Sequence, residues 1–183
     1  MMSTTSDHQL AIDIGNTAIK AAVFLEGKMI GPVVRFTDQE WDVADRLVTN
    51  HGVQNIIYST VANVPPVKWV DKWNNAGQLL LRLGPGLLLP FTSEYETMAT
   101  LGQDRIAAVA GSLALPTSTA PASAPQKRHA AQLIVDAGTC MTLDLIDGNR
   151  RYLGGNISPG LRMRLRAMHH FTARLPQPEP GPT

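Results

Sequence analysis

The chain has 183 residues, of which 44% are hydrophobic, 17% are charged and one is cysteine; this composition excludes a chain disordered throughout, an intramolecular disulfide and a cysteine-based zinc cluster. The net charge of +1 is unevenly spread, with −4 over residues 1–149 and +5 over residues 150–183. Because the arginines at 162, 164 and 166 alternate with apolar residues, the basic end predicts a solvated or interfacial helix face, and nucleic acid is not expected as a partner.

The sequence predicts a cytoplasmic protein without a membrane segment. Residues 1–8 have neither the basic region nor the apolar region of a secretory leader. The longest apolar stretch, residues 106–115, is about half the roughly 18 residues that a spanning helix needs.

Strands and helices alternate along the chain, which predicts an α/β architecture. A low-complexity segment rich in Pro, Thr, Ser and Ala, residues 116–130, predicts a solvated linker. Before it, strands are expected over 10–14, 18–25, 28–36, 53–58 and 79–83. Helices are expected after Asp38 as N-cap, and over 65–73, 93–100 and 103–115. After it, residues 133–139 repeat the pattern of residues 10–16 and are followed by an apolar strand. A further strand is expected over 151–153, and a helix capped by Ser158 over 159–171.

The two halves of the sequence share an internal repeat. An apolar strand ends in Asp-x-Gly at Asp13-Ile14-Gly15 and again at Asp136-Ala137-Gly138, and each copy continues into a second apolar strand and an acid–Gly turn. The first turn is Glu26-Gly27 and the second is Asp147-Gly148. Two such hairpins are far less expected by chance than one, so the sequence predicts two related lobes.

The repeated hairpin has the chemistry of a nucleotide clamp. An Asp at the end of a buried strand is costly unless it is paired or binds a cation, and carboxylates suit Mg²⁺ bound to substrate phosphates. The backbone N–H groups of Gly15, Asn16 and Thr17 can donate to a phosphate, with Lys20 supplying positive charge nearby. The alternative is that Asp13 and Asp136 only cap tight turns.

A second cluster, Gly102-Gln103-Asp104-Arg105, opens a predicted helix. An Asp there is commonly an N-cap, but Arg105 opposes the helix macrodipole unless an anionic ligand lies at the helix N-terminus. Asp104 would then face the same ligand and could accept a proton from a hydroxyl.

Four ordered motifs resemble those of type III pantothenate kinases. They are Asp13-Ile14-Gly15-Asn16-Thr17, Gly102-Gln103-Asp104-Arg105, Asp136-Ala137-Gly138-Thr139 with Thr142, and Gly154-Gly155-Asn156-Ile157-Ser158-Pro159-Gly160. The resemblance covers about residues 9–176. It implies the actin/hexokinase/Hsp70-like (ribonuclease H-like) fold and transfer of the ATP γ-phosphate to the terminal hydroxyl of pantothenate, the first step of coenzyme A synthesis.

The resemblance also implies roles for residues. Asp104 would be the general base, with Tyr95, Gly102, Gln103, Asp104 and Arg105 binding pantothenate. ATP and its Mg²⁺ would be bound by the run Asp13, Ile14, Gly15, Asn16, Thr17, Ala18, Ile19 and Lys20, together with Thr139. Asp136, which the residues alone assign to Mg²⁺, would instead bind a monovalent cation, K⁺ or NH₄⁺. Family members are homodimers, so a second copy is an expected partner.

The expected domains are residues 1–115 as a first lobe, 116–130 as linker and 131–183 as an incomplete second lobe. The proline-rich segment 176–183 cannot continue a core element, and a further substrate-contacting Thr of the family has no counterpart here. Two alternatives therefore stand beside an active kinase: a non-catalytic nucleotide-binding accessory protein of the same family, and another phosphotransferase with a different acceptor.

Overall fold

The computed structural model describes residues 8–61, 63–84, 86–93, 98–115 and 130–179, and the chain forms two compact units. The first unit comprises residues 1–87 and 102–104, and the second comprises residues 88–101 and 105–183. This division departs from the expected boundary at residue 115, since most of the helix that follows Gly102 groups with the second unit. The expected linker, apart from residue 130, lies outside the described residues.

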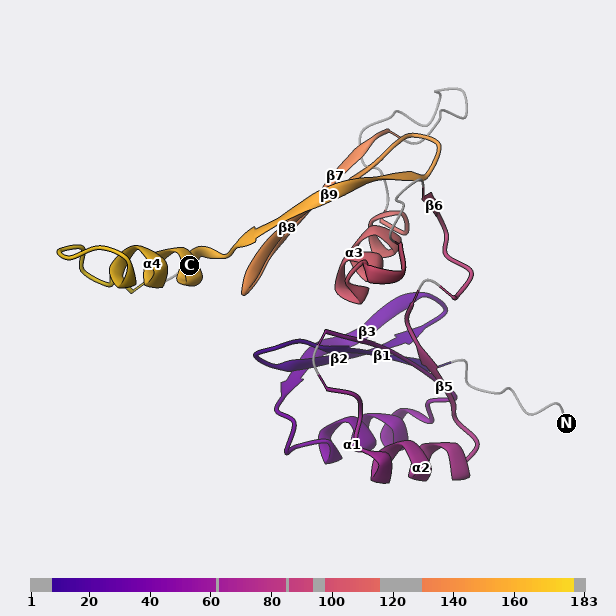
Figure 1. Ribbon diagram of the computed structural model, residues 1–183. Coiled ribbons are helices and arrows are strands. Elements are labelled where there is room, and N and C mark those ends of the chain that lie inside the picture. Colours follow the sequence, from indigo (N-terminus) through magenta and orange to yellow (C-terminus); the bar gives the residue numbers. More distant parts are fainter. Residues whose placement is uncertain (1–7, 62, 85, 94–97, 116–129, 180–183) are drawn as a thin grey trace, which may run out of the picture. The chain divides into compact units, whose positions relative to one another are not determined.

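The first unit contains a five-stranded mixed sheet with the strand order β3-β2-β1-β4-β5 (Figure 1). Its strands are β1 (His8–Ile14), β2 (Ile19–Leu25), β3 (Lys28–Phe36), β4 (Asn55–Thr60) and β5 (Leu79–Arg82). β1, β2 and β3 are successive antiparallel neighbours, whereas β4 pairs parallel to β1 and β5 parallel to β4. The α/β prediction is confirmed.

The expected turn at Glu26-Gly27 is confirmed. Both residues have positive φ, 51° and 75°, and Leu25 pairs directly with Lys28. Positive φ at both central positions is the geometry whose twist matches a hairpin, and glycine adopts it without strain.

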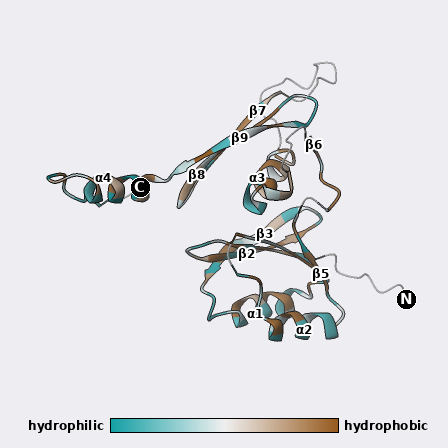
Figure 2. Cartoon of the chain, in the orientation of Figure 1, coloured by the Kyte–Doolittle hydropathy of each residue, from teal (hydrophilic) through white to brown (hydrophobic). Residues whose placement is uncertain are grey.

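Two helices, α1 (Asp42–His51) and α2 (Val67–Asn75), cover one face of this sheet (Figure 1). Both carry hydrophobic and hydrophilic residues, as amphipathic helices do (Figure 2). The ring of Trp41 lies 5.6 Å from that of Phe36 and 6.3 Å from that of Trp73, and all three rings are buried. The core they join also contains buried aliphatic residues of the sheet, of α1 and of the segment between α1 and β4, namely Leu10, Ile12, Ile14, Ile19, Ala21, Val23, Ala44, Val48, Val53 and Ile56.

The second unit contains a four-stranded sheet with the order β6-β9-β8-β7. Its strands are β6 (Thr92–Ser93), β7 (Gln132–Ala137), β8 (Cys140–Ile146) and β9 (Arg151–Pro159). β7, β8 and β9 are successive antiparallel neighbours, as β1, β2 and β3 are, and β6 pairs parallel to β9. The predicted repeat of a hairpin followed by a third strand is therefore present in the structure.

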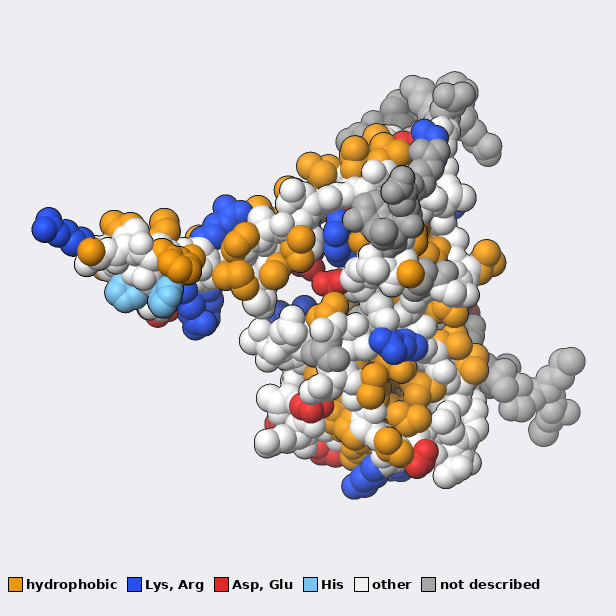
Figure 3. Space-filling view, in the orientation of Figure 1, with side chains coloured by type: hydrophobic (Ala, Val, Ile, Leu, Met, Phe, Trp, Pro, Cys, Tyr) orange, Lys and Arg blue, Asp and Glu red, His pale blue; other side chains and the backbone are white. Residues whose placement is uncertain are grey.

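The two faces of the second sheet differ. One face lies against α3 (Gln103–Ser112) and carries the buried side chains of Thr142, Asp144, Ile146 and Tyr152 (Figure 1). On the other face, Leu133 pairs with Leu145, and these side chains are 63% and 40% exposed. Apolar side chains are visible along these strands and along α4 (Leu161–His170) in Figure 3.

Three local predictions are wrong. Of the expected helix 93–100, Ser93 instead belongs to β6 and pairs with β9, Met98–Thr100 forms a short 3₁₀ helix, η1, and residues 94–97 lie outside the described residues. The N-cap of α1 is Trp41; Asp38 instead accepts a hydrogen bond of 2.9 Å from the Trp41 indole. The expected strand 151–153 extends through Pro159, so α4 is preceded by Gly160 rather than by Ser158.

Among the described residues, the helices are all too short or too polar to cross a bilayer.

Candidate functional site

In the first unit, the end of β1 brings a carboxylate, an amine and a hydroxyl together. Lys20 Nζ lies 3.4 Å from Asp13 Oδ2, and Ser59 Oγ donates to Asp13 Oδ1 at 3.0 Å. The Asp13 and Lys20 side chains are 42% and 44% exposed, so both can reach a ligand in solvent. Lys20 therefore pairs with Asp13, which the sequence did not predict.

Strand register explains this grouping. Asp13 pairs with Lys20 across the antiparallel β1–β2 ladder and with Ser59 across the parallel β1–β4 ladder. The carboxyl ends of parallel strands meet at one sheet edge, where open α/β sheets bind ligands.

The expected ATP-binding run, Asp13 to Lys20, forms the turn between β1 and β2. Ile14 and Ile19 belong to the core, so their side chains point away from any ligand. Between them, Asn16 and Thr17 are exposed, and Gly15 N donates to Ala18 O at 3.3 Å. The turn offers a ligand its backbone and its polar side chains.

The motif expected to bind substrate begins α3, and its Gln103 is held by the end of β4. Thr60 N donates to Gln103 Oε1 at 3.0 Å, and the Thr60 hydroxyl donates to Asn63 O at 2.7 Å. Asp104 lies in the first helical turn and is partly buried. Ser59 and Thr60 were missed from the sequence; the available signal was a polar pair directly after the apolar strand 53–58.

Arg105 has an unexpected partner in the second unit. Its Nε and Nη2 donate to Asp144 Oδ1 at 3.0 and 2.6 Å, and Nη2 also donates to Tyr152 Oη at 3.0 Å. The Arg105 side chain is 12% exposed and that of Asp144 is fully buried. Sequence reasoning had assigned Arg105 to the substrate and overlooked Asp144 and Tyr152.

The second hairpin places Asp136 near the end of β7, where its side chain is exposed. In the turn that follows, Gly138 N donates to Cys140 O at 2.8 Å, and Gly160 N donates to Thr139 O at 3.1 Å. The segment that leads into α4 is therefore attached to this turn, close to the two residues expected to bind a cation and ATP. Tyr95 lies outside the described residues.

The donor set of each hairpin fits the expected cations. No group of three or more His, Cys, Asp or Glu side chains suited to a metal occurs in the part of the chain that the structure describes. Mg²⁺ bound to a nucleotide needs only one or two carboxylates, with phosphates and water completing its shell. Asp13, exposed and beside Ser59, meets that requirement, and Asp136 offers one exposed carboxylate in the second unit.

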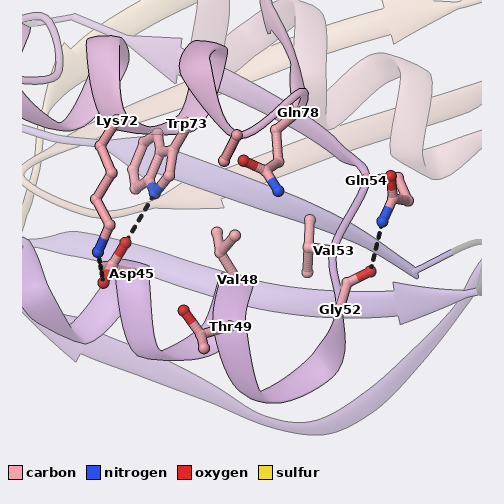
Figure 4. A pocket seen from close by; sticks show the side chains of 10 residues that line it. Asp45, Val48, Thr49, Gly52, Val53, Gln54, Lys72, Trp73 and Gln78 are labelled. Atoms are coloured by element: carbon pink, nitrogen blue, oxygen red, sulfur yellow. Dashed lines mark hydrogen bonds and ion pairs between the residues drawn. The ribbon is translucent and has the colours of Figure 1, made fainter.

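A cavity of about 250 Å³ opens between α1 and α2 in the first unit (Figure 4). Asp45 accepts hydrogen bonds from Lys72 Nζ at 2.6 Å and Trp73 Nε1 at 3.2 Å at one end of it. None of the predicted site residues lines this cavity.

The comparisons with known proteins agree with the motifs. Residues 9–182 match the family model described as type III pantothenate kinase. A type III pantothenate kinase of Bacteroides fragilis strain YCH46 is 36% identical over 179 residues, covering 91% of this chain and 63% of the relative. That of Christiangramia forsetii is 38% identical over 176 residues, covering 94% and 67%. The chain thus spans about two thirds of the length of these relatives.

Solved structures show weaker likenesses. A Ppx/GppA phosphatase of Aquifex aeolicus has a TM-score of 0.48 at 12% identity, with 88% of this chain and 55% of that chain covered. A putative 2-dehydro-3-deoxygalactonokinase from Sinorhizobium meliloti has a TM-score of 0.46 at 12% identity, with 90% and 57% covered.

The family model spans nearly the whole chain, and the motifs that match it occupy the ends of β1 and β7, the start of α3 and the strand β9. The chain therefore belongs to the type III pantothenate kinase family.

Proposed function

We propose that the protein phosphorylates pantothenate on its terminal hydroxyl with ATP as donor, giving 4'-phosphopantothenate and ADP in the cytoplasm. The observation that carries this proposal is the family match over residues 9–182. The polar cluster of half-exposed Asp13 and Lys20 with buried Ser59 supports it, because such groups suit a nucleotide phosphate and its cation.

The ATP phosphates would contact the turn after β1. Asn16 and Thr17 are exposed residues whose N–H groups and polar side chains would donate to the phosphates, and Lys20 adds positive charge beside Asp13. Mg²⁺ bound through Asp13 would neutralise charge on the phosphates, and a monovalent cation would be held by Asp136, with Thr139 contacting the nucleotide. Each group acts by positioning and charge neutralisation, which dominate phosphoryl transfer.

Pantothenate would bind at the start of α3, through Tyr95, Gly102, Gln103, Asp104 and Arg105. The Asp104 carboxylate would accept the proton of the attacking hydroxyl. The oxygen then forms its bond to the γ-phosphorus while the bond from that phosphorus to the ADP oxygen breaks. Gln103, bonded to the Thr60 amide, would keep the motif in register with the end of β4.

A coupled assay of ADP formation with and without pantothenate tests the proposal, with phosphopantothenate identified by mass spectrometry. Pantothenate-dependent turnover is expected in the wild type and near-total loss in Asp104→Asn. The matched control is Asp71→Asn, which removes an exposed carboxylate on α2 and should leave turnover unchanged.

The other outcomes are equally informative. Full activity in Asp104→Asn would remove this residue as the base. ATP binding without pantothenate-dependent turnover would favour the accessory protein over the kinase, and absence of ATP binding would overturn both. Analytical ultracentrifugation of the same sample tests the expected homodimer.

A further inference from the structure

Three side chains of the second unit form a largely buried hydrogen-bonded network. Arg105 donates from both Nε and Nη2 to Asp144, and the Tyr152 hydroxyl donates to Asp144 Oδ1 at 2.7 Å. The same hydroxyl accepts from Arg105 Nη2 at 3.0 Å, so each member contacts the other two. Asp144 and Tyr152 have no exposed surface.

Stability alone does not require this arrangement. A buried ion pair loses the hydration of two charges, and apolar residues of similar size often stabilise a fold as well or better. Asp144 lies on the face of β8 that also buries Ile146, where an apolar residue would continue the core. A buried charge pair at such a point fixes geometry rather than adding stability, because the two-pronged guanidinium tolerates few orientations.

Gly155 provides an independent observation. A Cβ atom on Gly155 would lie 2.1 Å from Leu143 O, 2.5 Å from Arg105 Nη2 and 2.7 Å from Asp144 Oδ1. All three distances are shorter than real Cβ contacts, so β9 can pass the ion pair only because residue 155 has no side chain. The strand and the ion pair are therefore fitted to one another.

The network begins one residue from the expected general base. On the other side of Asp104, the Gln103 side chain is held by the Thr60 amide. Both neighbours of Asp104 thus have fixed side chains, and the backbone that carries its carboxylate is held on both sides.

We infer that Asp144 and Tyr152 are positioning residues: through Arg105 they hold the first turn of α3 so that Asp104 presents its carboxylate to the acceptor hydroxyl. The inference rests on the proposed function. In this role Arg105 acts through its ion pair with Asp144. Such positioning matters because displacement of a catalytic group by about 1 Å can cost roughly a hundredfold in rate.

Tyr152→Phe is the sharpest test, since it keeps the ring packed against Phe91 and removes only the hydroxyl. We expect kcat for pantothenate phosphorylation to fall at least tenfold while KM for ATP stays within twofold. Asp144→Asn should lower kcat further, and circular dichroism establishes whether that variant folds. Tyr58→Phe is the matched control, because Tyr58 packs against the first unit's core and should leave kcat unchanged.

Combining variants separates positioning from a general loss of structure. In single-turnover reactions, Tyr152→Phe should have no further effect in an Asp104→Asn background, because the base it positions is already removed. An equal loss in both backgrounds, or a wild-type kcat in Tyr152→Phe, would overturn this inference and leave the proposed function intact. A wild type that forms no phosphopantothenate would overturn the proposed function itself, and this inference with it.

Discussion

The Tyr152 hydroxyl lies 2.7 Å from Asp144 Oδ1, eight residues earlier in the chain, and both side chains are fully buried. The β8–β9 ladder, in which Ile146 pairs with Tyr152 and Asp144 with Gly155, explains how the two meet on one face of the sheet. Arg105 completes the pair from α3. The resulting contact joins the proposed substrate-binding motif to the repeated hairpin, and its energetics can be measured.

Replacing the ion pair by apolar residues should separate stability from activity. Asp144→Leu alone leaves the Arg105 guanidinium buried without its counter-ion and should cost about 3–5 kcal/mol in the free energy of unfolding. The double variant Arg105→Met with Asp144→Leu should be more stable than either single variant, yet lack kinase activity. Urea unfolding of the four proteins provides the measurement, and additive losses would contradict the expectation.

Gly155→Ala and Gly111→Ala should change the free energy of unfolding in opposite directions. The new methyl group at 155 meets the Leu143 carbonyl and the ion pair, so we expect destabilisation by about 1–3 kcal/mol, as for overpacking. At Gly111, in α3, a Cβ meets nothing within 4 Å, and Ala should stabilise by roughly 0.5–1 kcal/mol. Thermal unfolding of both variants checks the signs; equal shifts would contradict the proposed crowding at 155.

The stability that the turn before α1 contributes should be lost in acid. The Thr37 hydroxyl and amide donate to Glu40 Oε2 at 2.7 and 2.9 Å, and these bonds hold the pKa of Glu40 below its ordinary value of 4.5. A lowered pKa in the folded state adds stability above pH 4.5 that is lost as the pH falls through the folded-state pKa. The difference in unfolding free energy between wild type and Glu40→Gln should therefore be present at neutral pH and vanish in acid. A difference that is the same at both would contradict this assignment.

Replacing Asp45 should cost more stability than replacing its ion-pair partner, Lys72. Asp45 accepts from the indole of Trp73, which is 1% exposed, and Asp45→Ala leaves that donor unsatisfied at a cost of about 1–3 kcal/mol (Figure 4). The Lys72 side chain is 53% exposed, so Lys72→Ala should change stability by about 1 kcal/mol or less. Comparison of the two unfolding midpoints in urea tests this order, and the reverse order would contradict it.

The Asp13 cluster should govern nucleotide affinity. Asp13→Asn is expected to weaken MgATP binding at least tenfold, about 1.4 kcal/mol, because it removes the carboxylate beside the turn. Ser59→Ala, which removes the hydroxyl that donates to Asp13, should weaken it less. Asp38→Asn, on an exposed loop of the same unit, is the control for titration calorimetry. Unchanged affinity in Asp13→Asn would place the nucleotide elsewhere.

The sequence by itself determined the local and repeated features of this protein. Apolar runs and the Glu26-Gly27 turn predicted the first hairpin, and recurrence of Asp-x-Gly predicted that β7–β9 would repeat it. The helical spacing of Trp41, Ala44, Leu47 and Val48 likewise predicted α1. Such patterns are readable because the residues that make each element are neighbours in the chain.

Only the tertiary structure decided the features that depend on distant partners. Ser93 joins a sheet because β9 pairs with it, against its predicted helix, and β9 continues through Ser158 and Pro159 because β8 lies alongside. Asp144 is 39 residues from Arg105, and Ser59 is 46 from Asp13. Strand register and helix packing fix these contacts, and neither is encoded in the spacing of a single segment.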